Sequence, residues 1–402
     1  MEYIKIRNFG PISEVDITLK KVNIFIGEQG VGKSTLAKLL SCCRDFILYF
    51  MILNEENNEN VMKIFGRYGL QGYFKEDTII EYHEDDSFQL KYCNGHFDVS
   101  HDRISREKLN DFMYNIISSC IEDTCKILGT PIEIEKMDLE EIKKIIPGKI
   151  PLILSNLRTS LYCPAERSIV SIMANSLASM MLNKIPLPYT LLEYMSFFEK
   201  ARLEFTKFNI PFLKLSYSFE DGKNAVTVND ASVKLEYASS GIQSVLPLLM
   251  VIEYCLQHKF FSSFTIEEPE LNLFPTNQLH LIQTLIAKTN REDTSLGSWT
   301  ITTHSPYLLS VFNISLLAGR ITEKFPDATD RLSELIQPGH VIKPDEISVY
   351  ELTRSSSPYC RSIIDENTGL IKSNYLDSVS DIISADFNRL YKLYIQLTKN
   401  AK

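Results

Sequence analysis

Alternating apolar and polar residues open the chain and predict two strands. Residues 2–6 and 14–19 alternate in this way around a Gly10-Pro11 turn. Residues 22–26 are nearly all apolar, which is typical of a strand that is buried on both faces. The sequence therefore predicts strand, turn and strand, followed by a third strand that runs into a glycine-rich loop.

The pattern then takes the helical period, and a helix is expected from Thr35 to about Leu53. The stretches TIIEYHED and SFQLKYC further along predict a hairpin that closes at Asn94-Gly95. Helical patterns flank the hairpin, near 107–128 and 138–146. We interpret 55–155 as a mainly helical lobe inserted into the fold.

Strands and helices alternate from residue 156 onwards. Strands are expected within 160–168 and at 213–219, 225–229, 232–237, 263–267, 299–303, 347–353 and 360–364. Helices are expected up to about 208 and at 239–257, 276–289, 306–318 and from about 379. This order predicts an α/β fold with a mixed sheet and an antiparallel β subdomain, divided as 1–54, 55–155 and 156–402.

Composition narrows the class of protein. The 402 residues are 44% hydrophobic and 23% charged, which is ordinary for a soluble globular chain. The net charge of −9 gives no general attraction for nucleic acid. Eight cysteines without a C-x-x-C pair disfavour a zinc site or a disulfide framework. No signal peptide or membrane-spanning run is recognised, so we expect a cytoplasmic protein.

A phosphate-binding motif follows the third strand. It consists of Gly27, Glu28, Gln29, Gly30, Val31, Gly32, Lys33 and Ser34, with Thr35 next to it. The spacing G-x-x-x-x-G-K-[ST] between a strand and a helix is that of a P-loop. Backbone N–H groups and Lys33 would hold the phosphates of ATP, and Ser34 would bind Mg²⁺. The alternative is a chance glycine-rich turn.

Two acids end the predicted strand 263–267, in the stretch TIEEPELNLFP. The strand would deliver Glu267 as a ligand of Mg²⁺ and Glu268 as the group that polarises an attacking water. An acidic loop after a core strand is the alternative reading, and the P-loop makes it less favoured.

Two further motifs complete the candidate chemistry. In SSGIQ, Ser240, Gly241 and Gln243 stand at the start of an apolar helix, where a hydroxyl and open N–H groups can meet a γ-phosphate. A serine there is also common as a simple helix cap. In TTHSP, His304 ends a strand and can sense the γ-phosphate, or it is an ordinary histidine at a strand end.

The order of these motifs resembles that of ABC-type ATPases of the SMC and repair branch. More narrowly, YCPAERS, YASSGIQSVLPLL, IEEPELNLFP and TTHSPYLL resemble the bacterial AAA_15 and OLD-like ATPases of anti-phage systems such as PARIS, Septu and some retrons. The resemblance implies a P-loop NTPase fold of ABC/SMC-head type and a homo-oligomer. ATP on one P-loop would meet Ser240, Gly241 and Gln243 of another copy.

The resemblance also implies roles for neighbouring residues. Glu270 and Asn272 would lie in the segment that crosses between copies, while Arg167 is assigned to a phosphate or subunit contact or to a salt bridge. Glu267 stands where ABC proteins usually have Asp, and Ile242 replaces the second signature glycine of LSGGQ. Neither change removes the catalytic chemistry, but slow hydrolysis is expected. No glutamine is assigned to the Q-loop.

The expected partner is a separate effector, a nuclease or toxin. OLD nucleases carry a carboxyl-terminal TOPRIM domain, whereas the stretch after His304 shows no acidic cluster of that kind. The lobe 55–155 is our candidate for effector recognition. Two alternatives remain: an ATPase for DNA repair or DNA-end processing, and a nucleotide-holding scaffold that sequesters a toxin. GTP is disfavoured because the sequence has no N-K-x-D motif.

Overall fold

The computed structural model describes most of the chain outside the middle segment 102–159. The described residues are 2–45, 48, 52, 58–84, 88–101, 160–173, 186–258, 261, 263–291, 298–355, 357–372 and 374–400. The helices expected near 107–128 and 138–146, and with them most of the proposed lobe, lie outside these ranges.

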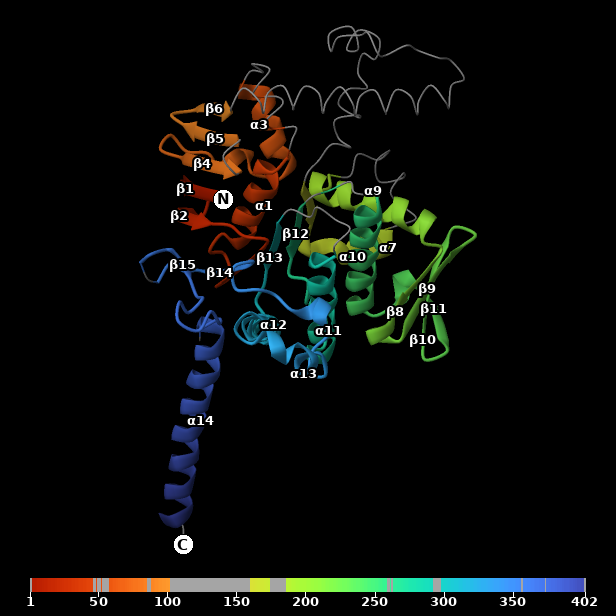
Figure 1. The fold of residues 1–402 in the computed structure, drawn as a ribbon, viewed down its shortest axis with the longest axis vertical. Helices are drawn as coiled ribbons and strands as arrows, with labels where there is room; N and C mark the ends of the chain where they lie inside the picture. The colour runs from red at the N-terminus through yellow and green to blue at the C-terminus, as the bar shows by residue number, and fades with distance from the viewer. Residues whose placement is uncertain are drawn as a thin grey trace.

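An antiparallel sheet forms the N-terminal part (Figure 1). Its strands, in spatial order, are β2 (Ile12–Thr18), β1 (Tyr3–Phe9), β4 (Ile79–Glu84), β5 (Phe88–Cys93) and β6 (His96–His101). β4 pairs with β1, and the turn at Asn94-Gly95 joins β5 to β6. The hairpin assigned to an inserted lobe is therefore an extension of the first sheet. The prediction that Asn94-Gly95 closes it is wrong, because β4 pairs with β5 up to Glu84 and Phe88, and Asn94-Gly95 closes the next hairpin, β5 with β6. Local alternation predicts such strands but not their long-range partner.

The central sheet carries the loops that matter for function. Its order is β15 (Cys360–Ser362), β14 (Ile347–Leu352), β3 (Val22–Gly27), β13 (Trp299–Thr302), β12 (Ser263–Glu267) and β7 (Ser160–Cys163). All pairs are parallel except β14 with β15. Parallel strands end at one edge of the sheet, so the loops after β3, β12 and β13 are brought together there.

Both faces of the central sheet are covered. Alternate residues of β3 enter two different cores: Phe25 packs with α1 (Lys33–Cys43) and the N-terminal sheet, whereas Ile24 packs with the helices of the other face. Those helices include α10 (Ser240–Gln257), α11 (Pro275–Thr289) and α12 (Pro306–Lys324). Coverage on both faces explains why β3 reads as a continuous apolar run.

The first helix ends earlier than predicted. α1 stops at Cys43, with Arg44 as its C-cap, rather than near Leu53. The buried Arg44 guanidinium donates hydrogen bonds to Glu2 at 2.7 Å and to Thr300 at 2.8 Å. These bonds fix the end of α1 to the two neighbouring sheets. α3 (Asn58–Arg67) is the next complete helix described.

A third sheet and its helices flank the core. β8 (Lys207–Ile210), β9 (Leu215–Glu220), β10 (Lys223–Val228) and β11 (Ala231–Lys234) form an antiparallel meander, which confirms the predicted β subdomain. α7 (Ser168–Met173) and α9 (Tyr189–Glu204) pack beside α10. α10 is long and apolar enough to cross a membrane, but 78% of that stretch is buried inside the protein, as in a core helix.

Two helices complete the carboxyl-terminal part. The short α13 (Thr329–Ser333) follows α12. α14 (Tyr375–Asn400) starts slightly before the predicted position near 379 and extends away from the rest of the molecule (Figure 1).

Candidate functional site

The glycine loop has the backbone shape that its sequence requires. Gly27, Gly30 and Gly32 have φ angles of 151°, 78° and 98°, which other residues rarely adopt. A Cβ on Gly27 would lie 2.3 Å from the carbonyl oxygen of Leu352, so the loop also needs glycine for close packing. Gly32 is the N-cap of α1, whose first N–H groups therefore open towards the loop.

Lys33 is held at the mouth of this loop. Its ammonium donates to the carbonyl oxygens of Gly27 at 2.8 Å and Glu28 at 2.7 Å. Burial lowers the pKa of Lys33 to about 8, although the negative charges of Glu268 and Glu267 oppose this shift. The lysine therefore keeps its proton at pH 7 and lies near Glu267, the proposed ligand of Mg²⁺, and Glu268, the proposed catalytic glutamate.

The other loop residues divide into two groups. Glu28, Gln29 and Ser34 are exposed, so their side chains can reach a ligand. Val31 and Thr35 are buried, with 2% and 6% of their surface exposed. These two can serve a phosphate only through their backbone N–H groups.

Glu267 ends β12 as a buried carboxylate. One of its oxygens, Oε1, is buried and has no hydrogen-bond partner among the described residues. Burial and the charge of Glu267 raise the pKa of the neighbouring Tyr162, so its phenol stays protonated. A buried carboxylate oxygen without a partner is the expected state of a group that binds a cation.

These residues fit a magnesium ion. Mg²⁺ prefers hard oxygen ligands and keeps several waters, so that one or two protein groups and the substrate phosphates suffice. The Glu267 carboxylate and the exposed Ser34 hydroxyl are of this kind. Among the described residues no group of three or more His, Cys, Asp or Glu side chains could hold a metal by itself.

Glu268 takes a left-handed backbone conformation, with φ of 42°. This strained geometry is uncommon for a residue with a side chain, and it turns the carboxylate out of the strand direction. Burial and the adjacent charge of Glu267 raise the pKa of Glu268, while Lys33 lowers it. A carboxylate with a raised pKa is suited to accept a proton from water.

Arg167 builds the turn that carries both acids. Its buried guanidinium donates to the carbonyl oxygens of Glu267 and Glu268, each at 2.7 Å, and to those of Pro164 and Pro269, each at 3.2 Å. The expected phosphate or subunit contact is therefore wrong for this side chain, as is the alternative of a salt bridge, because backbone carbonyls occupy both Nη1 and Nη2, while Nε is buried without a hydrogen-bond partner among the described residues. A buried cation with this set of acceptors fixes the shape of the loop of residues 267–273, which we call the acidic loop.

The histidine motif joins the same loop. The buried Glu270 carboxylate accepts hydrogen bonds from the Thr303 hydroxyl at 2.6 Å and from the His304 N–H at 3.0 Å. His304 Nε2 lies 3.8 Å from Glu268 Oε1. Burial and the positive charge of Lys33 lower the pKa of His304, so the imidazole is neutral at pH 7. Lys33, Glu267, Glu268 and His304 thus converge.

The SSGIQ segment is built differently. Ser239 and Ser240 are exposed at the start of α10, and neither caps the helix through a side-chain hydrogen bond. A Cβ on Gly241 would lie 2.7 Å from the carbonyl oxygen of Asn272, so the helix tip packs tightly on the acidic loop. We call Ser239 to Gly241 the serine tip.

Gln243 holds this tip from inside. Its amide donates to the carbonyl oxygens of Glu236 at 2.9 Å and Leu235 at 3.4 Å, and the residue is buried. Pro247 has no N–H for the Gln243 carbonyl, and the Ser171 hydroxyl donates to that carbonyl instead, at 2.7 Å. The Gln243 side chain therefore positions the serine tip rather than presenting its amide to a ligand.

Two residues beside the P-loop were missed by sequence reasoning. Arg354 donates to the carbonyl oxygen of Gly30 at 3.1 Å, and the Tyr359 hydroxyl donates to that of Val31. Both follow β14, which is the neighbour of β3 in the sheet. These two residues could be found only from the order of the strands in the sheet, which local sequence does not contain.

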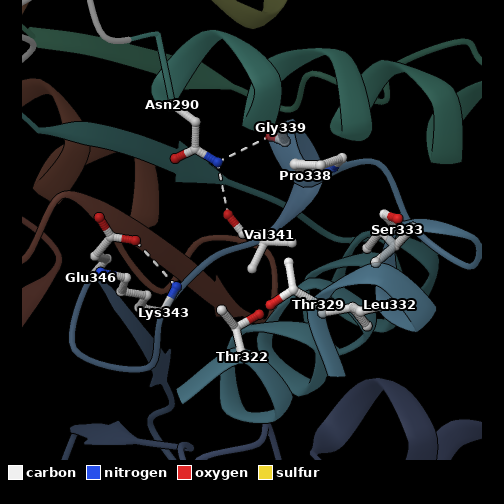
Figure 2. Close-up of a pocket in the computed structure, with 11 residues that line it drawn as sticks. Asn290, Thr322, Thr329, Leu332, Ser333, Pro338, Gly339, Val341, Lys343 and Glu346 are labelled. Carbon is white, nitrogen blue, oxygen red and sulfur yellow. Dashed lines mark hydrogen bonds between the residues drawn. The ribbon is translucent and has the colours of Figure 1, made fainter. Parts of the chain in front are cut away.

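A cavity of about 700 Å³ lies at the opposite edge of the central sheet (Figure 2). Asn290 donates there to the carbonyl oxygens of Gly339 and Val341, while Lys343 and Glu346 belong to the turn that enters β14. It is therefore separate from the phosphate loop, which follows the other end of the strands.

Three solved structures are similar to the chain at low identity. The SMC head domain from Thermotoga maritima is 10% identical, with 77% of this chain and 90% of that one covered and a TM-score of 0.37. The Smc head domain with an extended coiled coil, bound to the C-terminal domain of ScpA derived from Pyrococcus furiosus, is 11% identical, with 96% and 99% covered and a TM-score of 0.38. A dimeric ATP-binding cassette bound to ADP and Pi is 13% identical, with 76% and 89% covered and a TM-score of 0.30.

Comparison of the sequence with curated proteins and with family models identifies the family of the chain. No curated protein matches the chain closely enough to count as a relative. The family model AAA_15, described as an AAA ATPase domain, matches residues 1–309, which include the P-loop, the acidic loop and His304. The chain therefore belongs to the AAA_15 family of ATPase domains.

Proposed function

We propose that this protein binds ATP with Mg²⁺ at the P-loop and hydrolyses it. The loop N–H groups and Lys33 would hold the phosphates, and Ser34 and Glu267 would be the ligands of Mg²⁺. The positive charge of Mg²⁺ would offset the negative charge of the phosphates. Glu268 would take a proton from the attacking water. His304, neutral and close to Glu268, would orient that water towards the γ-phosphate.

The catalytic site would be completed by a second copy of the chain. The exposed serine tip offers hydroxyl groups and the N–H groups of a helix start, which are suited to a γ-phosphate. In this proposal Ser240 and the Gly241 N–H approach ATP on the partner, and Gln243 supports them from within. Asn272, packed against Gly241, couples the tip to its own acidic loop.

The cellular role that we propose is control of a separate effector, a nuclease or a toxin, in anti-phage defence. Its support is the resemblance of the four motifs to the ATPases of such systems. The ATP-bound assembly would be the state that holds or releases the effector. Co-purification of the chain with the product of an adjacent gene, and loss of phage protection in a Lys33→Ala strain, would support this role. Full protection by that strain would contradict it.

One observation carries the enzymatic proposal: Lys33, Glu267, Glu268 and His304 converge after three neighbouring parallel strands, while the serine tip remains exposed. ATP turnover and light scattering should therefore be measured on the wild type and on Glu268→Gln. The variant should bind ATP, lose turnover and gain an ATP-dependent oligomer. Wild-type turnover without any gain in oligomer would refute the proposal.

A further inference from the structure

Buried polar atoms without partners gather beside the proposed metal site. The Tyr162 hydroxyl, the Thr265 hydroxyl and Glu267 Oε1 have no hydrogen-bond partner in the part of the chain that the structure describes. The three residues are only 1%, 0% and 5% exposed, so bulk water does not compensate these atoms. An unpaired buried polar atom costs free energy, and several of them together require a functional explanation.

The order and register of two strands bring Tyr162 to Glu267. Tyr162 of β7 is the register partner of Thr265 of β12, and the two strands are parallel neighbours. Glu267 lies two residues further along β12, so its side chain points to the same face of the sheet. Strand spacing and rise place the Cα atoms of Tyr162 and Glu267 about 8 Å apart. The long side chains of a tyrosine and a glutamate can span this distance.

This face of the sheet is the one that α1 covers. Tyr162 belongs to the same core as Leu36 of α1. Ile266, which precedes Glu267 in β12, belongs to the core of the other face. The other proposed ligand of Mg²⁺, Ser34, lies in the first turn of α1. Tyr162 therefore packs between the strand and the helix that supply the two ligands.

The ring of Tyr162 is fixed by its neighbours. The Lys38 ammonium lies 5.8 Å from the centre of the ring, and the Tyr68 ring meets it edge-on at 6.3 Å between centroids. Lys38 stands one turn after Ser34 on α1. A rigid aromatic ring with a polar tip is suited to hold a neighbouring group in one orientation.

The chemistry of the pair is complementary. Burial, and then the charge of Glu267, raise the pKa of Tyr162 well above its ordinary value, so the hydroxyl keeps its proton and is a donor. A carboxylate accepts through both oxygens, so Glu267 can accept from Tyr162 with one oxygen and bind Mg²⁺ with the other. Mg²⁺ in proteins takes carboxylates, carbonyls and waters, so the phenol would serve the carboxylate rather than the ion.

We propose that Tyr162 is a positioning residue for Glu267, whose carboxylate it holds by a hydrogen bond when Mg²⁺ and ATP are bound. The inference rests on the proposed function. A glutamate side chain has several rotatable bonds, so a carboxylate that is not held loses conformational freedom when it binds the ion. A donor that is already fixed reduces this loss. Removal of such an outer partner lowers metal affinity by about 10–100-fold.

Nucleotide binding with and without Mg²⁺ tests this role independently of turnover. A non-hydrolysable imido analogue of ATP should be titrated into the full chain by calorimetry, once with saturating Mg²⁺ and once with EDTA. Tyr162→Phe removes only the hydroxyl, so the Kd with Mg²⁺ should rise about tenfold or more. The Kd with EDTA should not change, because the P-loop still holds the phosphates. An unchanged Kd with Mg²⁺ would overturn the proposal.

A stability measurement separates positioning from packing. The hydroxyl has no partner in the nucleotide-free chain, so Tyr162→Phe should not lower the midpoint of denaturant unfolding. A lower midpoint together with weaker binding in EDTA would show that the hydroxyl supports the fold, and would overturn the proposal.

Thr265→Val is the matched control for Tyr162→Phe. It removes another buried hydroxyl without a partner from the same face, but on a short side chain that lies level with Tyr162 rather than with Glu267. Both Kd values should stay at those of the wild type. A rise in the Kd with Mg²⁺ equal to that of Tyr162→Phe would remove the special role of Tyr162.

A double variant tests whether Tyr162 acts through Glu267. Glu267→Gln should itself raise the Kd with Mg²⁺, and Tyr162→Phe should add nothing in that background. A further rise in the double variant would assign the hydroxyl to a different group and overturn the proposal.

Failure of this inference is distinguishable from failure of the proposed function. If Glu267→Gln weakens binding with Mg²⁺ and Tyr162→Phe does not, only the positioning role of Tyr162 is refuted. If the wild type binds the analogue equally well with Mg²⁺ and with EDTA, or does not bind it, the proposed site for ATP and Mg²⁺ is refuted, and this inference with it.

Discussion

The Lys33 region and the serine tip are the two halves of one proposed site, and they are built in opposite ways. Around Lys33 the functional groups hold one another: the lysine is bound by loop carbonyls, and the turn of Glu267 and Glu268 is bound by Arg167. At the tip, the serines are exposed and only the supporting groups, Gly241 and Gln243, are buried.

This difference indicates a division of labour. A region whose lysine and acidic turn are already fixed by hydrogen bonds within the chain can act there, since little reorganisation is needed. A region whose polar side chains are exposed on a rigid support is ready to act on something else. In this account, the groups of the phosphate loop are positioned within one chain, whereas the serine tip is positioned to meet ATP on a second chain.

The largest expected effect is a loss of turnover on substitution of Glu268, in the Lys33 region. Glu268→Gln removes the group that accepts a proton but keeps its size, so kcat should fall about 10²–10⁴-fold. ATP affinity should change little, because the phosphates are held by the loop. Turnover and nucleotide binding measure the two quantities separately. Glu334→Gln, on an exposed segment, is the control. An equal fall in kcat in this variant would contradict the assignment of Glu268 as the group that accepts the proton.

Arg167→Met should damage the same half through its scaffold. The substitution leaves several buried carbonyl groups without a donor, and the free energy of unfolding should fall by about 3 kcal/mol or more. Denaturant unfolding measures the loss, with the exposed Arg331→Met as a matched control. A small loss, comparable to that of the control, would show that Arg167 does not hold the acidic turn.

Ser171→Ala addresses the tip. It removes the donor for the Gln243 carbonyl, which Pro247 cannot replace, and should lower the free energy of unfolding by about 1–3 kcal/mol. Ser310→Ala removes an exposed hydroxyl bond to backbone and should cost less. If both variants unfold alike, the tip does not depend on Ser171.

The smallest effect concerns pH. The pKa of Lys33 is about 8, below its ordinary value, so the free protein loses this positive charge as the pH rises through 8. ATP affinity should then fall by at most about tenfold per pH unit above 8, because binding must return the proton. Calorimetry in buffers of different ionisation enthalpy should detect proton uptake at pH 9. Affinity that is flat from pH 7 to 9 would contradict this account of Lys33.

Local sequence was sufficient for the strands and motifs of the central sheet. The apolar run at 22–26 gave β3, and the predicted strand 263–267 coincides with β12. The convergence of Lys33, Glu267 and His304 was also foreseeable, because parallel strands end at one edge. Period and loop chemistry are local properties, and the strands and motifs depend on nothing else, whereas the convergence also requires β3, β13 and β12 to be neighbours in one sheet.

Features that depend on long-range contacts could not be foreseen. Nothing near Arg167 shows that three of its four acceptors lie about one hundred residues away in the acidic turn. The same holds for Arg354 beside Gly30, and for β4 beside β1. Gln243 was assigned to ATP because its motif resembles a signature, whereas its amide is bound inside its own chain.

The most direct test of a shared site is a mixing experiment. Lys33→Ala destroys the phosphate loop, Ser240→Arg blocks the serine tip, and each variant by itself should be inactive. In a two-fold assembly the mixed dimer contains one intact site, so an equal mixture should regain about one quarter of wild-type turnover. Turnover that stays at the level of the separate variants, or a Ser240→Arg protein as active as the wild type, would contradict an ATP site shared between two chains.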